Sequence, residues 1–440
     1  MNEIMPFLLF LSLFGLLMLG FPVAFTLGGV SLFFGLLTFG FDFFNLLPLR
    51  IWGVMTNYVL IAVPLFIYMG VMLEKSGLAE ELLETMALLF GRLRGGLAVS
   101  VVIVGALLAA STGIVGATVV TMGLLSLPTM LKRGYSPELA SGAIAASGTL
   151  GQIIPPSIVL VLLGSVLNVS IGDMFIGAII PGFILVFFYL LWILFVALTR
   201  PEAAPSMPAT ELEKFRGKAM VVRIFRAFLP PILLMIAVLG SIFAGIASPT
   251  EAAAVGAFGA GLLTLIRGRL NYQTLKAVMH ETTYLTCMVF IILVGATAFG
   301  LVFRGMDGDK ILTRMILEAN LGPHAFLAIV MLAIFIAGFF IDFIEITFII
   351  VPVVAPIFVH LNVNLLWLGI LIAMNLQTSF LTPPFGFSLF YLKGVAPASV
   401  TTGHIYRGII PFIVIQLVTL ALVILFPQMA TYLPSIVLGD

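Results

Sequence analysis

The fold of this chain is decided by residues 147–157, Ser147-Gly148-Thr149-Leu150-Gly151-Gln152-Ile153-Ile154-Pro155-Pro156-Ser157, and by residues 375–385, Asn375-Leu376-Gln377-Thr378-Ser379-Phe380-Leu381-Thr382-Pro383-Pro384-Phe385. Each stretch places a double proline inside an apolar segment that is otherwise long enough to cross a bilayer. Hydrocarbon cannot satisfy a freed backbone group, so both helices are predicted to break against protein, water or a bound ion. Because proline has no N–H, four carbonyls lose their helical donors, those of Gly151, Gln152, Ser379 and Phe380.

The composition around these stretches is that of a membrane protein. Of the 440 residues, 62% are hydrophobic and 9% are charged, whereas soluble domains carry about 25% charged residues. The apolar runs have helical lengths and lack the alternation of an outer-membrane barrel, which predicts an all-α polytopic membrane protein. The first residues, Met1-Asn2-Glu3, lack the basic region of a signal peptide, so the first apolar run is expected to stay as an anchor.

Charge and cysteine content exclude several other classes. A net charge of +1 argues against a nucleic-acid partner. A single cysteine, Cys287, excludes an internal disulfide and any metal site with several cysteines. The chain has no Walker-type Gly-Lys-Ser/Thr, no G-x-S-x-G and no H-E-x-x-H, so an ATPase or a membrane hydrolase has little support.

The two stretches belong to an internal repeat. Pro155 and Pro383 are 228 residues apart, and Pro128 and Pro356 keep the same offset. Such a register, kept over an apolar sequence, indicates a duplicated unit.

Basic residues predict that the two copies are inverted. Lys132 and Arg133 follow the first hairpin, whereas no lysine or arginine lies near the corresponding His360 of the second copy. By the positive-inside rule the first loop is cytoplasmic and the second is not. The first hairpin should therefore enter from the cytoplasm and the second from outside.

This plan divides the chain into four parts. We expect N-terminal scaffold helices in 1–56, a first repeat in 57–199, a cytoplasmic linker with scaffold helices in 200–281, and a second repeat in 282–427. Each repeat contains a scaffold helix and an arm helix, followed by three further pieces. In the first repeat these are a re-entrant hairpin at 97–131, a broken helix at 138–167 and a helix at 174–198. In the second they are a hairpin at 325–358, a broken helix at 361–398 and a helix at 402–426.

The first break offers oxygen ligands to a hard cation. Freed carbonyls and hydroxyls suit Na⁺, and a polar hairpin tip accompanies the break. The alternative is that the double proline only kinks the helix, with neighbours or water satisfying its carbonyls. The cation candidates are Ser111, Thr112 and Gly113 at the tip and Gly148, Thr149, Gly151, Ile153 and Pro155 at the break. Thr149, Gln152 and Ser157 are candidates for substrate binding or coupling, as are Glu345, Asn375, Gln377 and Thr378 of the second half.

The second half offers carboxylates as well. Asp342 and Glu345 are three residues apart on one helix face, deep in an apolar run, where either could bind a cation or exchange a proton. The alternative is that one of them lies in water at the outer mouth. The other candidates here are Gly338, Asn375, Gln377, Thr378, Ser379 and Thr382.

Residues 148–157 are accompanied by three further motifs, Asp173-Met174-Phe175-Ile176, Ile180-Pro181-Gly182 and Leu381-Thr382-Pro383-Pro384-Phe385-Gly386. On these motifs the chain resembles the large, DctM-like membrane subunit of TRAP (tripartite ATP-independent periplasmic) transporters. The resemblance covers essentially the whole chain. It implies an elevator-type, Na⁺-coupled importer of organic acid anions in the bacterial inner membrane. It also implies two partners, a small four-helix membrane subunit and a periplasmic substrate-binding protein.

The family's sodium sites can be carried over to this sequence. The first falls on Ser111 to Gly113 and on Gly148, Gly151, Ile153 and Pro155, and the second on Gly338, Ser379 and Thr382, to which we add Asp342. This chain has Ile114 and Val115 where the family often has small hydroxyl residues, and Ser379 where it often has glycine.

The small membrane subunit could be part of this chain or a separate chain. Residues before 57 supply only two or three spans, so the small subunit is expected to be a separate chain. The alternative is a stand-alone proton- or sodium-coupled anion transporter without a binding protein.

Overall fold

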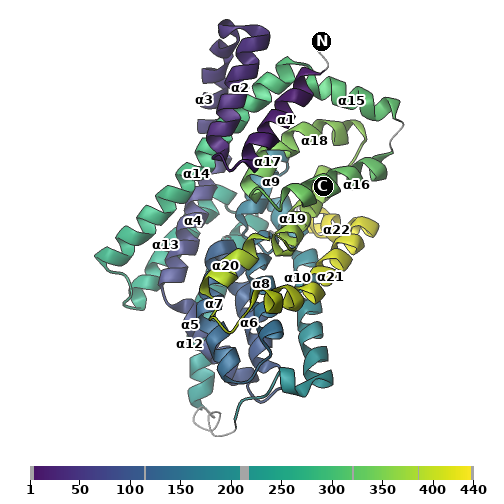
Figure 1. Ribbon diagram of the computed structural model, residues 1–440. Coiled ribbons are helices and arrows are strands. Elements are labelled where there is room, and N and C mark those ends of the chain that lie inside the picture. The colour runs from purple at the N-terminus through teal and green to yellow at the C-terminus, as the bar shows by residue number, and fades with distance from the viewer. Residues whose placement is uncertain (1–3, 113–114, 209–217, 320–321, 385, 438–440) are drawn as a thin grey trace.

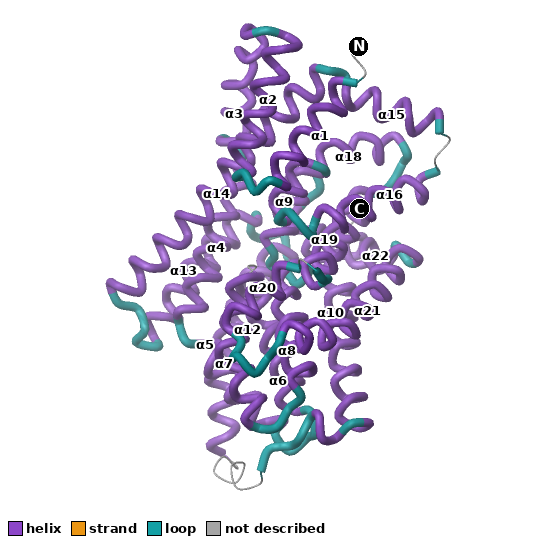
Figure 2. Tube along the Cα trace, in the orientation of Figure 1, coloured by secondary structure: helices purple, strands orange, loops and turns teal. Residues whose placement is uncertain are grey.

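The computed structural model describes residues 4–112, 115–208, 218–319, 322–384 and 386–437. Within these ranges the chain is helical and has no strand (Figures 1 and 2). Seven of the described helices are long and apolar enough to cross a membrane, or eight if one bent pair counts as a span. The prediction of an all-α polytopic membrane protein is confirmed.

The first repeat contains a hairpin and a helix that breaks at the double proline. The hairpin consists of α6 (Gly96–Thr112) and α7 (Val115–Lys132). The broken helix consists of α8 (Pro137–Thr149), a single 3₁₀ turn η3 (Leu150–Gln152) and α9 (Ile158–Leu167), and α10 (Ile171–Thr199) follows.

The second repeat follows the same plan with a less regular hairpin. Its outgoing arm is α16 (Pro323–Ala337), and its return arm is divided into α17 (Phe343–Ile349) and α18 (Val351–His360), which meet at 49°. The broken helix is α19 (Leu365–Leu381) with α20 (Phe387–Val395), and α21 (Thr402–Leu425) follows.

The remaining helices flank these units, and α4 packs against α13 and α14 while α14 packs against α2. Before the first hairpin they are α1 (Met5–Met18), α2 (Val23–Phe39), η1 (Phe41–Leu46), α3 (Leu47–Met55), η2 (Tyr58–Ile61), α4 (Ala62–Lys75) and α5 (Leu78–Phe90). Between the repeats and after them they are η4 (Pro201–Ala203), α12 (Lys218–Phe243), α13 (Pro249–Ile266), α14 (Tyr272–Gly305), α15 (Gly308–Glu318) and α22 (Gln428–Val437).

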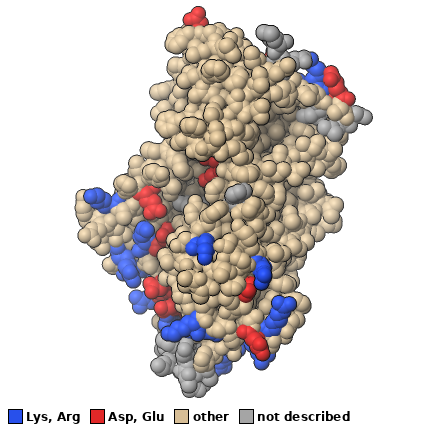
Figure 3. Space-filling view, viewed as in Figure 1, with Lys and Arg blue, Asp and Glu red and all other residues tan. Residues whose placement is uncertain are grey.

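Backbone hydrogen bonds and an ion pair connect the loops that carry basic residues, and these loops lie at one end of the molecule. The N–H of Gly95 donates to the carbonyl of Ala204 at 2.9 Å, and the N–H of Ser136 donates to the carbonyl of Ala203 at 3.0 Å. Arg267 pairs with Glu81 of α5 at 2.6 Å. Figure 3 shows most of the visible Lys and Arg in the lower half of the face, and in Figure 1 α6 and α7 lie in the lower half while α16 and α18 lie in the upper half. The two hairpins therefore occupy opposite ends, as an inverted repeat requires.

The two repeats meet at equivalent residues. Thr149 of α8 and Gln377 of α19 are 228 positions apart, which is the repeat offset, and the Gln377 amide donates to the Thr149 hydroxyl at 3.5 Å. Both side chains are buried. A second buried bond joins the units, from the Gln416 amide on α21 to the Tyr189 hydroxyl on α10 at 2.7 Å.

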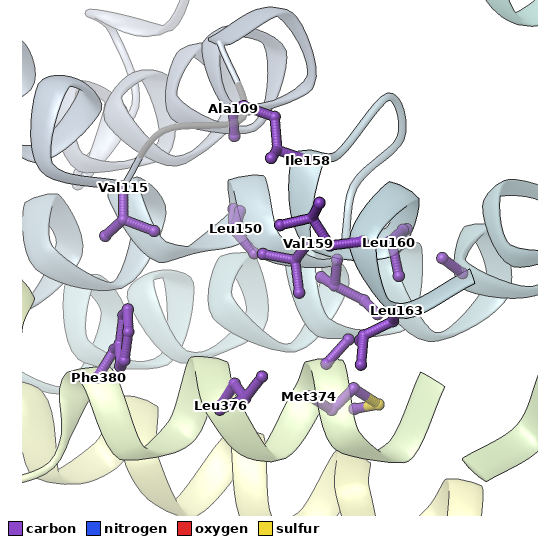
Figure 4. Close-up of a cluster of buried hydrophobic side chains, with 14 of the residues drawn as sticks. Ala109, Val115, Leu150, Ile158, Val159, Leu160, Leu163, Met374, Leu376 and Phe380 are labelled. Carbon is purple, nitrogen blue, oxygen red and sulfur yellow. The ribbon is translucent and has the colours of Figure 1, made fainter. Parts of the chain in front are cut away.

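Apolar side chains fill the space between α9 and α19. Figure 4 shows Val159 and Leu163 on one side and Met374 and Leu376 on the other, all of them nearly or fully buried. Among helices in hydrocarbon, close packing supplies much of the stabilisation, because lipid tails are as apolar as leucine. Small residues let the helices approach, since a side chain at Gly148 would overlap Val119 of α7.

Three features differ from the expected boundaries. Helix α14 begins ten residues before the expected start at 282 and extends to Gly305. Helix α12 continues through Pro230 and Pro231, so a double proline alone does not break a helix here. Helix α22, beyond the last expected span, was not anticipated, and its Ala430 packs against Gly177 of α10.

Candidate cation and substrate site

At the first break, a side chain replaces one of the missing helical donors. The N–H groups of Ile153 and Ile154 both donate to the carbonyl of Leu150, at 3.1 and 2.9 Å. The hydroxyl of Ser157 donates to the carbonyl of Gln152 at 2.9 Å. The Gln152 carbonyl thus lacks its helical N–H donor, as predicted, and a protein group takes that place, because Ser157 lies just past the prolines and reaches back to it.

The second break repeats this arrangement with a serine from a different position. The Thr382 N–H donates to the carbonyl of Ser379 at 3.1 Å, and the Ser388 hydroxyl donates to the carbonyl of Phe380 at 2.9 Å. Both carbonyls thus lack their helical N–H donors, as predicted, and accept other protein groups instead. The Pro155–Pro156 and Pro383–Pro384 peptide bonds are both cis.

Each break is contacted by the end of its own hairpin. A Cβ on Gly151 would lie 3.3 Å from the carbonyl oxygen of Ala109 on α6. A Cβ on Gly338, just after α16, would overlap the hydroxyl of Ser379. The structure therefore brings Gly338 and Ser379 together, as the predicted second site requires.

The first predicted site is only partly described. Ser111 and Thr112 form the last turn of α6, and Gly113 lies outside the described residues. Gly148 and Gly151 lie on the α8 side of the break, in α8 and η3, and Ile153 and Pro155 lie within the break itself.

Two hydroxyls of α19 and that of Thr382, which follows its last residue, point back along the helix. Thr378, Ser379 and Thr382 donate to the carbonyls of Met374, Leu376 and Thr378 at 2.8, 2.8 and 2.7 Å respectively. A hydroxyl that donates its hydrogen keeps two lone pairs, which can accept a hydrogen bond or bind a hard cation. The chemistry of this set fits Na⁺.

Asp342 and Glu345 form a helix cap. The carboxylate of Asp342 accepts from the N–H of Phe343 at 2.7 Å, and the Asp342 N–H donates to Glu345 Oε2 at 2.6 Å. The pair is a capping box at the start of α17. Both side chains are half-buried.

The buried amides differ in their partners. The Asn375 side chain donates to the Met331 carbonyl of α16 at 2.7 Å, which ties α19 to the second hairpin. Gln152 is fully buried, and neither polar atom of its amide has a hydrogen-bond partner among the described residues. Among the described polar side chains at the two breaks, Gln152 is the one that is buried with both amide atoms lacking a hydrogen-bond partner.

A comparison with known proteins gives the family of the chain. The family model described as "Tripartite ATP-independent periplasmic transporter, DctM component" matches residues 10–429. The chain belongs to this family. The resemblance seen in the sequence is thus confirmed, and the chain is a TRAP large permease of the bacterial inner membrane.

Individual relatives agree with this assignment. The C4-dicarboxylate TRAP transporter large permease protein DctM of Pseudomonas aeruginosa is 32% identical over 408 residues, which is 92% of this chain and 93% of that protein. The sialic acid TRAP transporter large permease protein SiaM of Vibrio cholerae is 30% identical over 427 residues, or 97% of each chain.

A solved structure supports the fold of the TRAP permease. The crystal structure of the YdaH transporter of Alcanivorax borkumensis matches with a TM-score of 0.64 and 13% sequence identity, over 88% of this chain and 89% of that one. At this identity the match speaks only for the fold.

A cavity in the TRAP permease adds residues that the sequence analysis missed. It has a volume of about 490 Å³ and lies between the hairpins, α4 and α14. Asp342 and Gly116 come from the hairpins, while Glu74 of α4 and Glu281 of α14 face them. In the sequence, Glu74 and Glu281 are carboxylates near one end of an apolar span, and an interfacial side chain would give the same pattern.

Proposed function

We propose that this TRAP permease imports small organic acid anions together with Na⁺. The single observation that carries the proposal is the contact of each hairpin end with an oxygen-lined break, made closest where Gly338 meets Ser379. A cation held between two chain segments by oxygens from both would fasten the hairpin to the break.

The coupling follows from this geometry. Sodium at Gly338, Ser379 and Thr382 would order the start of α17, and sodium among the residues of the first site would order the tip of the first hairpin. The substrate carboxylate would then bind between the ordered tips of the two hairpins. The hairpins and broken helices would move together past the scaffold in an elevator motion.

The proposal includes two partners. Relatives are named for C4-dicarboxylates and for sialic acid, which all carry carboxylates, and their names place them in tripartite systems. We infer that a periplasmic substrate-binding protein delivers the anion to this chain. A small four-helix membrane subunit, as a separate chain, would complete the scaffold.

Sodium itself provides the first test, since it does not depend on knowing the substrate. Anything that binds only the folded state stabilises it, by about 2.7 kcal/mol at a hundred times its Kd. We expect NaCl, compared with choline chloride at equal ionic strength, to raise the Tm of the purified chain in detergent or nanodiscs. Thr382→Val should lose the part of this rise that comes from the second site.

The chain offers a matched control for this substitution. Thr419 of α21 makes the same bond one turn back along its helix, to Ile415 at 2.8 Å, and is buried, whereas Thr382 is half-buried. Thr419→Val should keep the full sodium effect. An unchanged sodium effect in Thr382→Val, or an equal loss in both variants, would contradict the second site.

Reconstitution tests the tripartite function. Proteoliposomes with the large and small subunits should take up the organic acid found on the partner binding protein only when that protein and an inward sodium gradient are both present. Uptake by the chain alone would instead support the stand-alone transporter.

A further inference from the structure

Two cavities follow one another along α14. The first, already described beside Asp342, is lined on α14 by Glu281, Tyr284, Leu285, Met288 and Val289. The second has a volume of about 480 Å³ and is lined by seven residues of α14 between Leu293 and Arg304. Helix α3 lies on its scaffold side, and Phe348, Ile349, Pro352 and Val353 of the second hairpin lie opposite. The same helix thus faces the mobile hairpins at two levels.

The two levels carry opposite charge. Arg50 of α3 and Arg304 of α14 line the second cavity, at the end away from the basic loops, and their charges are close enough to repel. Neither arginine forms an ion pair or side-chain hydrogen bond within the described parts of the chain, and Asp309 supplies an opposing charge that acts on Arg304 without pairing with it. Two adjacent guanidinium groups without a shared counter-charge are a ready site for an oxyanion.

The first cavity is acidic. Glu74, Glu281 and Asp342 line it, and the ammonium group of Lys75 lies 3.7 Å from Glu74 and 3.9 Å from Glu281. One positive charge among three carboxylates leaves this level unfavourable for an anion. Oε2 of Glu74 is buried and has no hydrogen-bond partner among the described residues.

The distance between the two cavities along α14 is one that the second hairpin could cover by sliding along that helix. The middles of the two lining segments, near Leu285 and Ala298, lie about 20 Å apart at about 1.5 Å per residue along the helix. A rigid shift of the second hairpin along α14 by that amount would carry the surroundings of Asp342 from one cavity to the other.

We propose that Arg50 and Arg304 form a carboxylate-binding site on the periplasmic side of the scaffold, which collects the substrate anion, and that Glu74 and Glu281 favour its release at the cytoplasmic level. This inference rests on the proposed anion import. The charge difference sets the affinity on each side and the rate of capture. It supplies no net driving force, which still comes from sodium.

The site can be tested without knowing the natural substrate by using succinate as a probe. Carbon-13 succinate is titrated against the purified chain in phosphatidylcholine nanodiscs, in potassium buffer without sodium, and binding is followed by NMR line broadening. We expect saturable binding that weakens with ionic strength and whose Kd rises at least tenfold in the double variant Arg50→Gln/Arg304→Gln. Lys310→Gln is the matched control, because Lys310 is a basic residue of the same end already paired with Asp307 at 2.7 Å.

The outcomes separate the site from the transport proposal. Absence of sodium-independent binding, or binding unchanged in the double variant, overturns the inference while sodium-driven uptake stands. Displacement of succinate by phosphatidylglycerol in the nanodisc would assign the arginines to lipid phosphate and also overturn it. Binding lost only in the double variant, in a chain that shows no sodium effect, would keep the arginine site and refute sodium coupling.

Discussion

The break after α8 and the break after α19 share a backbone plan but differ in their side chains. Gln152 and Phe380 occupy the same repeat position, and each carbonyl accepts a serine hydroxyl, from Ser157 and Ser388 respectively. The two serines do not correspond in the repeat, since position 160, which matches Ser388, is leucine. The backbone requirement is therefore duplicated, while the side chain that meets it differs between the halves.

The two hairpins differ in the same way. The return arm of the first is the continuous helix α7, whereas that of the second is bent by 49° between α17 and α18. Pro352, at the start of α18, corresponds to Leu124 within α7. The second hairpin thus has an additional joint close to the predicted sodium ligands, which makes it the half in which small changes should have the larger effect.

The largest effect is expected at the contact between the second hairpin and its break. Gly338→Ala would place a methyl group against the Ser379 side chain, whose Cβ would lie only 2.7 Å away. Overpacking of this kind costs about 1–3 kcal/mol, and the hairpin end would move off the break. We expect loss of sodium-dependent stabilisation and at least a tenfold drop in sodium-driven uptake, measured as initial rates in proteoliposomes.

A glycine in open space controls for this change. Nothing lies within 4 Å of a Cβ built on Gly394 in α20, so Gly394→Ala should keep both the sodium effect and uptake. Normal sodium dependence in Gly338→Ala would show that the contact with Ser379 is not part of the ion site.

The next effect compares two buried amides. Asn375→Leu removes the donor to the Met331 carbonyl, and a buried polar group left without a partner costs about 1–3 kcal/mol. Gln152→Leu removes an amide that has no protein partner in the described chain and makes the first break resemble the second, which has phenylalanine there. We expect Tm to fall in Asn375→Leu and to rise in Gln152→Leu, and a fall in both would mean that a bound water or ion already satisfies Gln152.

The breaks could be predicted from the sequence because their signal is covalent. A proline removes a donor wherever it stands, and the matched offsets of Pro155 with Pro383 and of Pro128 with Pro356 place the hairpins and breaks. The continuous helix through Pro230 and Pro231 shows the limit of this argument. Whether a freed carbonyl ends a helix depends on which groups lie beside it in space, and the sequence does not contain that information directly.

The candidate site was predictable to a similar extent. That Gly338 lies near Ser379 follows from pairing each hairpin with its own break, but the hydroxyl caps from Ser157 and Ser388 depend on tertiary distances. Glu74 and Glu281 were missed because a carboxylate at the end of a span looks the same in sequence whether it faces lipid headgroups or a cavity.

The smallest effect concerns the cap of the second hairpin. Glu345 corresponds in the repeat to Ala117 of α7, so Glu345→Ala gives the second hairpin the residue of the first. It removes the acceptor for the Asp342 N–H, and losing one side of a capping box costs about 1 kcal/mol. Glu345→Gln keeps a carbonyl oxygen in that position and should restore most of the stability, as read from Tm. If Glu345 acts only as a cap, Glu345→Gln keeps the pH profile of uptake, whereas loss of uptake in Glu345→Gln with Tm preserved would show that the carboxyl group exchanges a proton during transport.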